Sequence, residues 1–179
     1  MKGESIGVTT STTSFYNSDT GQWGGTIDPG DTSGQEFLSD IMNNPPTLDE
    51  YMANARNNKQ YDFKKTNGTT VSDNSLEIYR GMPIDKTSDG QTIYTSARDV
   101  GNIAAGYIAA INGLPWKVAR LGFDGYQSYT SKALKREGIS TQNAEKYGWE
   151  IGWNKTTFVT KGNNLFNSTK SFIKNMKLF

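Results

Sequence analysis

Glycines inside helical sequence patterns constrain the fold of this chain more than any other feature. Apolar residues recur at helical spacing through residues 94–153, and several glycines fall inside those patterns. They are Gly101, Gly106, Gly122, Gly125, Gly148 and Gly152. Each interior glycine costs roughly 1 kcal/mol of helix stability relative to alanine. Close approach of two helices or a backbone opened toward a ligand can offset this cost, and packing is the favoured interpretation.

Capping signals predict a mostly α-helical (α+β) fold. The expected helix starts are Ser33, Thr47, Ser96, Pro115, and Ser140 or Thr141. Hydroxyl residues at the start of a helix accept hydrogen bonds from free backbone N–H groups, and proline fits the first turn. The helix from Ser96 is expected to end at Asn112–Gly113, because glycine adopts the backbone conformation that closes a helix.

A small β-hairpin or short sheet is expected beside the helices. The segment 76–79 (LEIY) predicts a strand, the segment 92–95 (TIYT) its partner, and the turn-rich residues 80–91 their connection. Residues 1–32 are rich in Ser, Thr, Gly and Asp, which predicts a loosely ordered N-terminal arm or linker. Residues 33–179 are then expected to form a single compact domain, the default for a chain of 179 residues.

The chain contains neither cysteine nor histidine. The absence of cysteine excludes disulfides, thiolate metal sites and a cysteine nucleophile. The absence of histidine excludes the commonest general base and any Ser-His-Asp arrangement. An enzyme built from this sequence must therefore transfer protons through Asp, Glu, Tyr or Lys, or rely on positioning and charge.

The charge is nearly balanced, with 19 basic and 18 acidic residues. A protein that grips a phosphate backbone is expected to carry a basic surplus, so nucleic acid is not the first expectation. No apolar run is long enough to predict a membrane span, and residues 1–11 lack the pattern of a signal peptide.

A polar stripe is predicted on the helix after Pro115. Trp116, Arg120, Asp124 and Gln127 are spaced four, four and three residues apart, which places them on one helix face. An exposed Arg–Asp pair that stabilises only its own helix is the simpler interpretation. The aromatic and amide residues at the two ends of the stripe favour a site.

The preceding helix adds three polar residues near its start. Asp99 is expected to be a structural cap, since an acidic residue in the first turn meets free backbone amides. Capping does not explain Arg98 or Asn102, which we hypothesise to face Asp124 or a substrate.

A third polar cluster follows, in which carboxylates and amides lie near Tyr147, Trp149 and Trp153. Its members include Glu137, Ser140, Thr141, Gln142, Asn143, Glu145 and Glu150. Carboxylates beside aromatic residues are typical of glycoside hydrolysis, in which one acid protonates the leaving oxygen and a second carboxylate acts as base or nucleophile. Ordinary helix decoration by Glu and aromatic residues is the alternative.

The motif Glu77-Ile78-Tyr79-Arg80-Gly81 followed by Tyr94-Thr95-Ser96 resembles ADP-ribosyltransferases. In that family a Tyr-Arg-Gly lies on an early strand, and the arginine contacts the nicotinamide dinucleotide. The resemblance covers only short pieces, and no matching catalytic glutamate follows.

Ordered short blocks carry a second resemblance. They are ARDVGN (97–102), GY (106–107), NGLPW (112–116), FDGYQ (123–127) and STQNAEKYGW (140–149). Together they resemble the C-terminal toxin domains of Rhs-type polymorphic toxins, and more specifically polymorphic toxin type 44. The resemblance implies a toxin that a larger carrier or secretion apparatus delivers into a target bacterium, and a cognate immunity protein that neutralises it.

Hydrolysis of the bacterial cell-wall glycan is the preferred hypothesis, with Asp124 as the first catalytic carboxylate and Glu137 or Glu145 as the second. The residues expected to bind and orient the substrate are Arg98, Asn102, Trp116, Arg120, Gln127 and Gln142. No cofactor or metal is required by this set, although clusters of Asp and Glu could hold Mg²⁺ or Ca²⁺.

Other classes of function stay open, and one is the nucleotide-using toxin that the resemblance to ADP-ribosyltransferases implies. A ribonuclease would hold phosphate with basic residues and use a tyrosine as base. The basic residues in question are Arg98, Arg120, Lys135 and Arg136. A non-enzymatic binding module of an Rhs-like protein would need none of these chemical roles.

Overall fold

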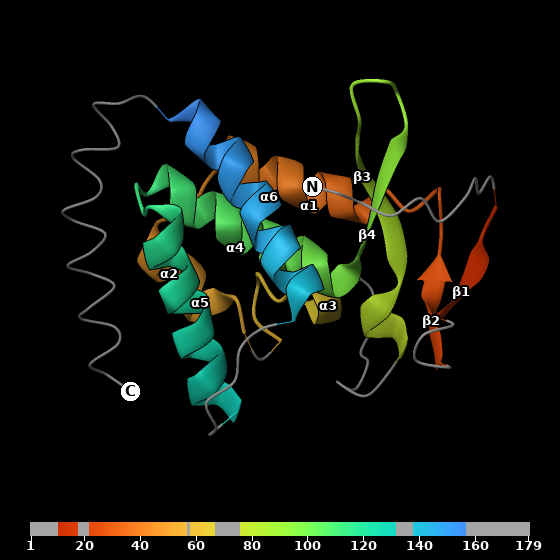
Figure 1. Ribbon diagram of the computed structural model, residues 1–179, viewed down its shortest axis with the longest axis horizontal. Helices are drawn as coiled ribbons and strands as arrows, with labels where there is room; N and C mark the ends of the chain where they lie inside the picture. The colour runs from red at the N-terminus through yellow and green to blue at the C-terminus, as the bar shows by residue number, and fades with distance from the viewer. Residues whose placement is uncertain (1–10, 18–21, 57, 67–75, 132–137, 157–179) are drawn as a thin grey trace. The chain divides into compact units, whose positions relative to one another are not determined.

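The computed structural model describes residues 11–17, 22–56, 58–66, 76–131 and 138–156 (Figure 1). It confirms the predicted fold class, since helices predominate and a small sheet accompanies them. The described residues group into two compact units. The first unit draws on residues 1–44 and 54–101, and the second on residues 45–53 and 102–179.

The sheet belongs to the first unit. Its strands are β1 (Thr13–Asn17), β2 (Gln22–Ile27), β3 (Gly81–Lys86) and β4 (Thr92–Ser96). They are hydrogen-bonded in the order β1-β2-β3-β4. The outer pairs are antiparallel, whereas β2 and β3 pair in parallel at Ile27 and Gly81. β1 and β2 are elements that the predicted arm of residues 1–32 lacked, while the boundary after residue 32 stays a prediction.

One predicted strand is wrong. Leu76–Tyr79 forms a 3₁₀ helix, η1, and the strand β3 lies in the segment that was predicted to be a connection. Pro83 can occupy β3 because the register shifts between Pro83 and Asp85, and such bulges accommodate proline in a strand. The predicted partner strand at Thr92–Thr95 is confirmed as part of β4.

Two glycines set the packing around this sheet. A side chain at Gly25 of β2 would overlap the main chain of Tyr79, so only glycine lets η1 lie directly against β2. A Cβ at Gly34 would lie 2.7 Å from the sulfur of Met82, which is itself fully buried.

The helices of this unit are α1 (Ser33–Asn43) and α3 (Phe63–Thr66). Buried apolar residues of the unit include Leu38, Ile41, Phe63, Ile78, Met82 and Val100.

The predicted helix starts at Ser33 and Thr47 have different outcomes. Thr32, not Ser33, is the N-cap of α1, and its hydroxyl donates to Glu36 over 2.6 Å. Thr47 does cap α2 (Leu48–Asn54), because its Oγ1 accepts a hydrogen bond of 3.3 Å from the N–H of Glu50.

The helix α4 (Ala97–Ile111) begins in the first unit and continues into the second. Its predicted end is confirmed, since Gly113 has a φ of 80°. The N–H of Gly113 donates to the carbonyl of Ala110 over 2.9 Å, and that of Leu114 to Ala109 over 3.0 Å. These two bonds form a Schellman motif, which satisfies carbonyls that a helix end would leave free.

Two long helices complete the second unit. α5 (Trp116–Ser131) starts directly after Pro115, whose carbonyl accepts bonds from the next turn. α6 (Ile139–Lys155) has Gly138 at its N-cap and no side-chain cap. The caps predicted at Ser140 or Thr141 are therefore wrong, and Thr141 is instead buried within the helix. Within the described ranges, no helix is long and apolar enough to cross a membrane.

Glycines allow α4 and α6 to cross at close range in the second unit (Figure 1). A side chain at Gly106 would overlap the main-chain carbonyl of Glu145. One at Gly148 would overlap the carbonyl of Ile103. The packing interpretation is therefore confirmed at this crossing, where the two backbones are in direct contact.

The other helix glycines differ among themselves. A Cβ at Gly152 would lie 2.8 Å from the carbonyl oxygen of Tyr107, so this glycine also serves the crossing. A Cβ at Gly101 or Gly125 would meet nothing within 4 Å. Close packing thus accounts for part of the glycine pattern and leaves these last two positions without a packing role.

Candidate functional site

The polar stripe predicted on one helix face lies on α5. Nη2 of Arg120 is 2.5 Å from Oδ1 of Asp124, one turn later. The guanidinium carbon of Arg120 lies 5.9 Å from the ring centroid of Trp116, one turn earlier. Residues four apart face the same way on a helix, so α5 alone brings these three together. Gln127 also lies on α5, but its side chain is outside the described part.

A second carboxylate reaches the same guanidinium from α6. Oε2 of Glu145 is 2.5 Å from Nη1 of Arg120. The side chain of Glu145 is 3% exposed, against 14% for Arg120 and 32% for Asp124. We refer to Arg120, Asp124 and Glu145 as the Arg120 cluster. It joins two of the residues predicted as catalytic through one predicted as substrate-binding.

The chemistry of the Arg120 cluster follows from its charges. A buried carboxylate is costly unless it is paired, and the guanidinium supplies the pair for Glu145. The planar guanidinium fork can meet two carboxylates at once through different nitrogens. One positive and two negative groups leave the cluster with a formal surplus of one negative charge. The negative charge nearest to solvent is that of Asp124, because its side chain is the most exposed of the three.

The sequence of α6 explains why Glu145 is buried. The residues buried on this helix are Thr141, Ala144, Glu145, Gly148 and Gly152. Glu145 therefore lies on the face of small residues that packs against α4. A carboxylate among small residues at helical spacing was the available signal that it needs a buried cation as partner.

Tryptophan side chains border the Arg120 cluster. The rings of Trp116 and Trp149 are tilted with centroids 6.0 Å apart, and those of Trp149 and Trp153 are stacked at 4.7 Å. Nε1 of Trp149 donates to the carbonyl of Leu114 over 2.8 Å. This hydrogen bond connects α6 to the residues just before α5. It also fixes the Trp149 ring, which lies between the rings of Trp116 and Trp153.

Asp99 is bonded to Ser96 at the start of α4, and its role as a cap stays a prediction. Its N–H donates to Oγ of Ser96 over 3.2 Å, and the same hydroxyl donates to Oδ2 of Asp99 over 3.1 Å. Nη1 of Arg98 donates to the hydroxyl of Tyr79 over 3.3 Å. Arg98 belongs to the first unit, and Asn102 to the second. The hypothesis that these two residues face Asp124 or a substrate stays a prediction.

The remaining predicted site residues lie elsewhere. Gln142 is partly exposed on α6, and its N–H donates to the carbonyl of Gly138 over 3.1 Å. Glu137, together with Lys135 and Arg136, lies outside the described residues. A substrate contact for Gln142 and a catalytic role for Glu137 stay predictions.

The segment that resembles ADP-ribosyltransferases is not placed as that resemblance implies. Tyr79 ends η1, Arg80 follows it, and only Gly81 lies on a strand. The guanidinium carbon of Arg80 lies 5.6 Å from the ring centroid of Phe63, and Nη1 donates to the carbonyl of Lys64 over 3.3 Å. Arg80 thus has a packing role in the first unit.

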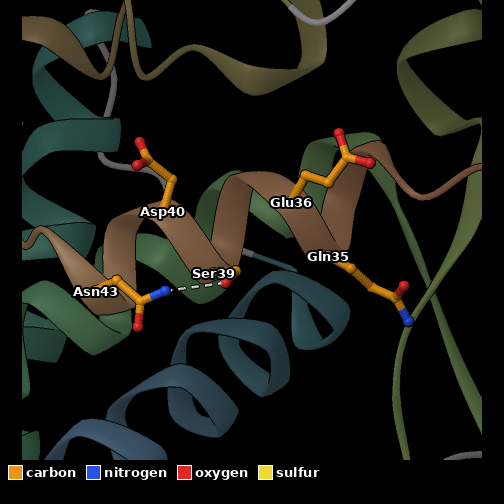
Figure 2. Close-up of a pocket in the computed structure, with 5 residues that line it drawn as sticks. All are labelled: Gln35, Glu36, Ser39, Asp40 and Asn43. Carbon is orange, nitrogen blue, oxygen red and sulfur yellow. Dashed lines mark hydrogen bonds between the residues drawn. The ribbon is translucent and has the colours of Figure 1, made fainter.

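A shallow hollow on α1 contains none of the predicted site residues. Its lining residues are Gln35, Glu36, Ser39, Asp40 and Asn43. Figure 2 shows that the two acidic side chains point to one side of the helix and the other three side chains to the opposite side. Nδ2 of Asn43 donates to Oγ of Ser39 over 3.2 Å. Polar groups that diverge in this way form no convergent site.

One buried side chain near the helix crossing has a shifted pKa. Burial raises the pKa of the Tyr107 phenol. Its ring contacts the crossing at Gly152, and Nζ of Lys155 lies 5.6 Å from its centroid. Among the residues that the structure places, no group of three or more Asp and Glu side chains is arranged to hold a metal ion.

Comparisons with known proteins give no family assignment. No family model, no curated protein and no solved structure matches this chain.

Proposed function

We propose that this chain is an interbacterial toxin domain that hydrolyses the glycan of the bacterial cell wall. The observation that supports it best is the Arg120 cluster, in which the partly exposed carboxylate of Asp124 is bound to a guanidinium that lies beside an aromatic ring. Glycoside hydrolysis needs carboxylates as acid, base or nucleophile, and it needs no histidine. Asp124 is the carboxylate proposed to meet the substrate, because it lies at the exposed end of the cluster.

The charge of the cluster favours a glycan over RNA. Arg120 was a candidate phosphate ligand for a ribonuclease, but Asp124 and Glu145 both lie against its guanidinium. A cation with two carboxylate partners attracts a polyanion poorly. An uncharged sugar ring can instead donate hydrogen bonds from its hydroxyls to the Asp124 carboxylate and pack against the partly exposed ring of Trp116.

The role in competition between bacteria rests on the resemblance of residues 94–153 to Rhs-type toxin domains. Under this proposal, a carrier or secretion apparatus delivers the domain into a target bacterium. A cognate immunity protein protects the producing cell. The cell-wall glycan then lies outside the cytoplasm of the target, which gives the proposal a compartment that can be tested.

The test is growth of a bacterium that expresses the chain either in the cytoplasm or with export to the periplasm. Each version carries the wild-type sequence, Asp124→Asn or the control Glu150→Gln. Glu150 is a suitable control because it also pairs with a cation one helix turn away and its side chain is exposed.

Killing from the periplasm that Asp124→Asn abolishes and Glu150→Gln preserves is the expected result. Killing from the cytoplasm would favour nucleic-acid or nucleotide chemistry. A folded Asp124→Asn variant with full toxicity would remove Asp124 from the site. No killing in either compartment would favour a binding module.

A further inference from the structure

Burial separates the two carboxylates of the Arg120 cluster. The side chain of Glu145 is 3% exposed and that of Asp124 is 32% exposed, although each lies 2.5 Å from the same guanidinium. A carboxylate that acts directly on a sugar must come within hydrogen-bond reach of it. Asp124 meets this requirement at the surface, and Glu145 does not.

Glu145 is held at both its main chain and its side chain. Its carbonyl lies against Gly106 of α4, where a side chain would overlap it. Its carboxylate accepts a hydrogen bond from Nη1 of Arg120. A group fixed at both ends within a packed interior is suited to hold another group in place.

We propose that Glu145 is a positioning residue, which holds Arg120 and thereby fixes the carboxylate of Asp124 at the surface. This inference rests on the proposed function, in which Asp124 meets the glycan. The guanidinium is planar, so a bond at Nη1 sets the direction of the N–H groups on Nη2. Asp124 binds Nη2 and is oriented by it.

The kinetic test compares Glu145→Gln, Glu145→Ala and Asp124→Asn in the release of reducing ends from soluble cell-wall glycan. Glutamine keeps an oxygen that can accept from Arg120, so Glu145→Gln should retain kcat within about tenfold. Loss of the hold in Glu145→Ala should lower kcat about 100-fold with KM little changed, because small misplacements of reacting groups have effects of that size.

Two kinetic outcomes would overturn the proposal. If Glu145→Gln loses as much activity as Asp124→Asn, then Glu145 acts on the substrate directly. If Glu145→Ala folds and keeps the wild-type kcat, then Glu145 serves stability alone.

A second measurement tests, without an activity assay, whether Glu145 holds the Arg120 side chain in place. Nitrogen-15 NMR of the arginine side chains should give separate Nη1 and Nη2 signals for Arg120 in the wild-type protein, with the assignment made from Arg120→Lys. The signals should stay separate in Glu145→Gln and merge in Glu145→Ala. Merged signals in the wild type would overturn the hold. Separate signals in a wild-type protein that releases no reducing ends would instead overturn the proposed function and leave the hold intact.

Discussion

Two ion pairs of identical spacing lie on neighbouring helices of the second unit. Arg120–Asp124 on α5 and Lys146–Glu150 on α6 both join residues four apart. The first pair is closed to 2.5 Å, with side chains 14% and 32% exposed. The second spans 3.8 Å, with side chains 53% and 47% exposed. In the first pair, the guanidinium also meets a further carboxylate, that of Glu145, from the adjacent helix.

The difference shows what sequence spacing leaves undetermined. A pair of residues at this spacing on an exposed helix contributes about 0.3–0.5 kcal/mol and needs no function to explain it. A guanidinium held by a buried carboxylate is coupled to the packing of two helices. A basic residue followed four positions later by an acidic one is therefore a surface ion pair in α6 and part of a candidate site in α5.

The largest effect on stability is expected from Glu145→Ala. It leaves the largely buried charge of Arg120 with one fewer carboxylate partner, which should lower the free energy of unfolding by about 3 kcal/mol. The control Glu150→Ala should change it by no more than about 0.5 kcal/mol. Urea denaturation at low salt measures both. Equal effects of the two substitutions would contradict the distinction between the two pairs.

A smaller loss is expected from Gly106→Ala, which forces α4 away from the carbonyl of Glu145. Overpacking of this kind lowers the free energy of unfolding by about 1–3 kcal/mol. Gly125→Ala on α5 is the matched control, since its side chain meets nothing. The control should gain up to about 1 kcal/mol from helix propensity. Thermal and urea unfolding of both variants check the signs, and a neutral Gly106→Ala would argue against the close crossing.

Ser96→Ala sharpens the contrast between a hydroxyl at a helix start and the Arg120 cluster. It removes the hydroxyl that bonds Asp99 and should cost about 1 kcal/mol of stability. Ser140→Ala is the control, because that exposed hydroxyl does not cap α6. Toxicity per folded molecule should be unchanged in both. A loss of toxicity in folded Ser96→Ala would give the start of α4 a role beyond folding.

The smallest effect is expected from pH. Burial raises the pKa of Tyr107 above its ordinary value of 10.0, so the folded state retains the phenol proton that the unfolded state loses. The stability it contributes is complete below pH 10.0 and is lost as the pH rises through the folded-state pKa. The free energy of unfolding should therefore fall more steeply above pH 10.0 in the wild type than in Tyr107→Phe. Parallel curves for the two proteins would contradict the assignment.

The helices were predictable where their end signals are local. Ser96, Asp99 and Gly113 fix both ends of α4 through contacts within a few residues. The sheet was harder to predict, because four apolar-rich residues such as Leu76–Tyr79 fit a 3₁₀ helix as well as a strand. Pro83 is unusual in a strand, and β3 accommodates it beside a register shift between Pro83 and Asp85.

The candidate site was predictable in part for the same reason. Helical spacing alone places Trp116, Arg120 and Asp124 together, and the structure bears this out. The bond between Arg120 and Glu145 joins residues 25 apart in the chain and depends on the packing of α6. No local pattern specifies it, although the small residues around Glu145 indicate its burial.

The central claim is tested most directly by incubating purified cell-wall glycan with the wild-type protein, Asp124→Asn and Glu150→Gln, and measuring released reducing ends. The account predicts equal rates for the wild type and Glu150→Gln. It predicts a rate 10²- to 10⁴-fold lower for Asp124→Asn, about the contribution of one acid–base group. No release by the folded wild-type protein, or full activity in folded Asp124→Asn, would contradict it.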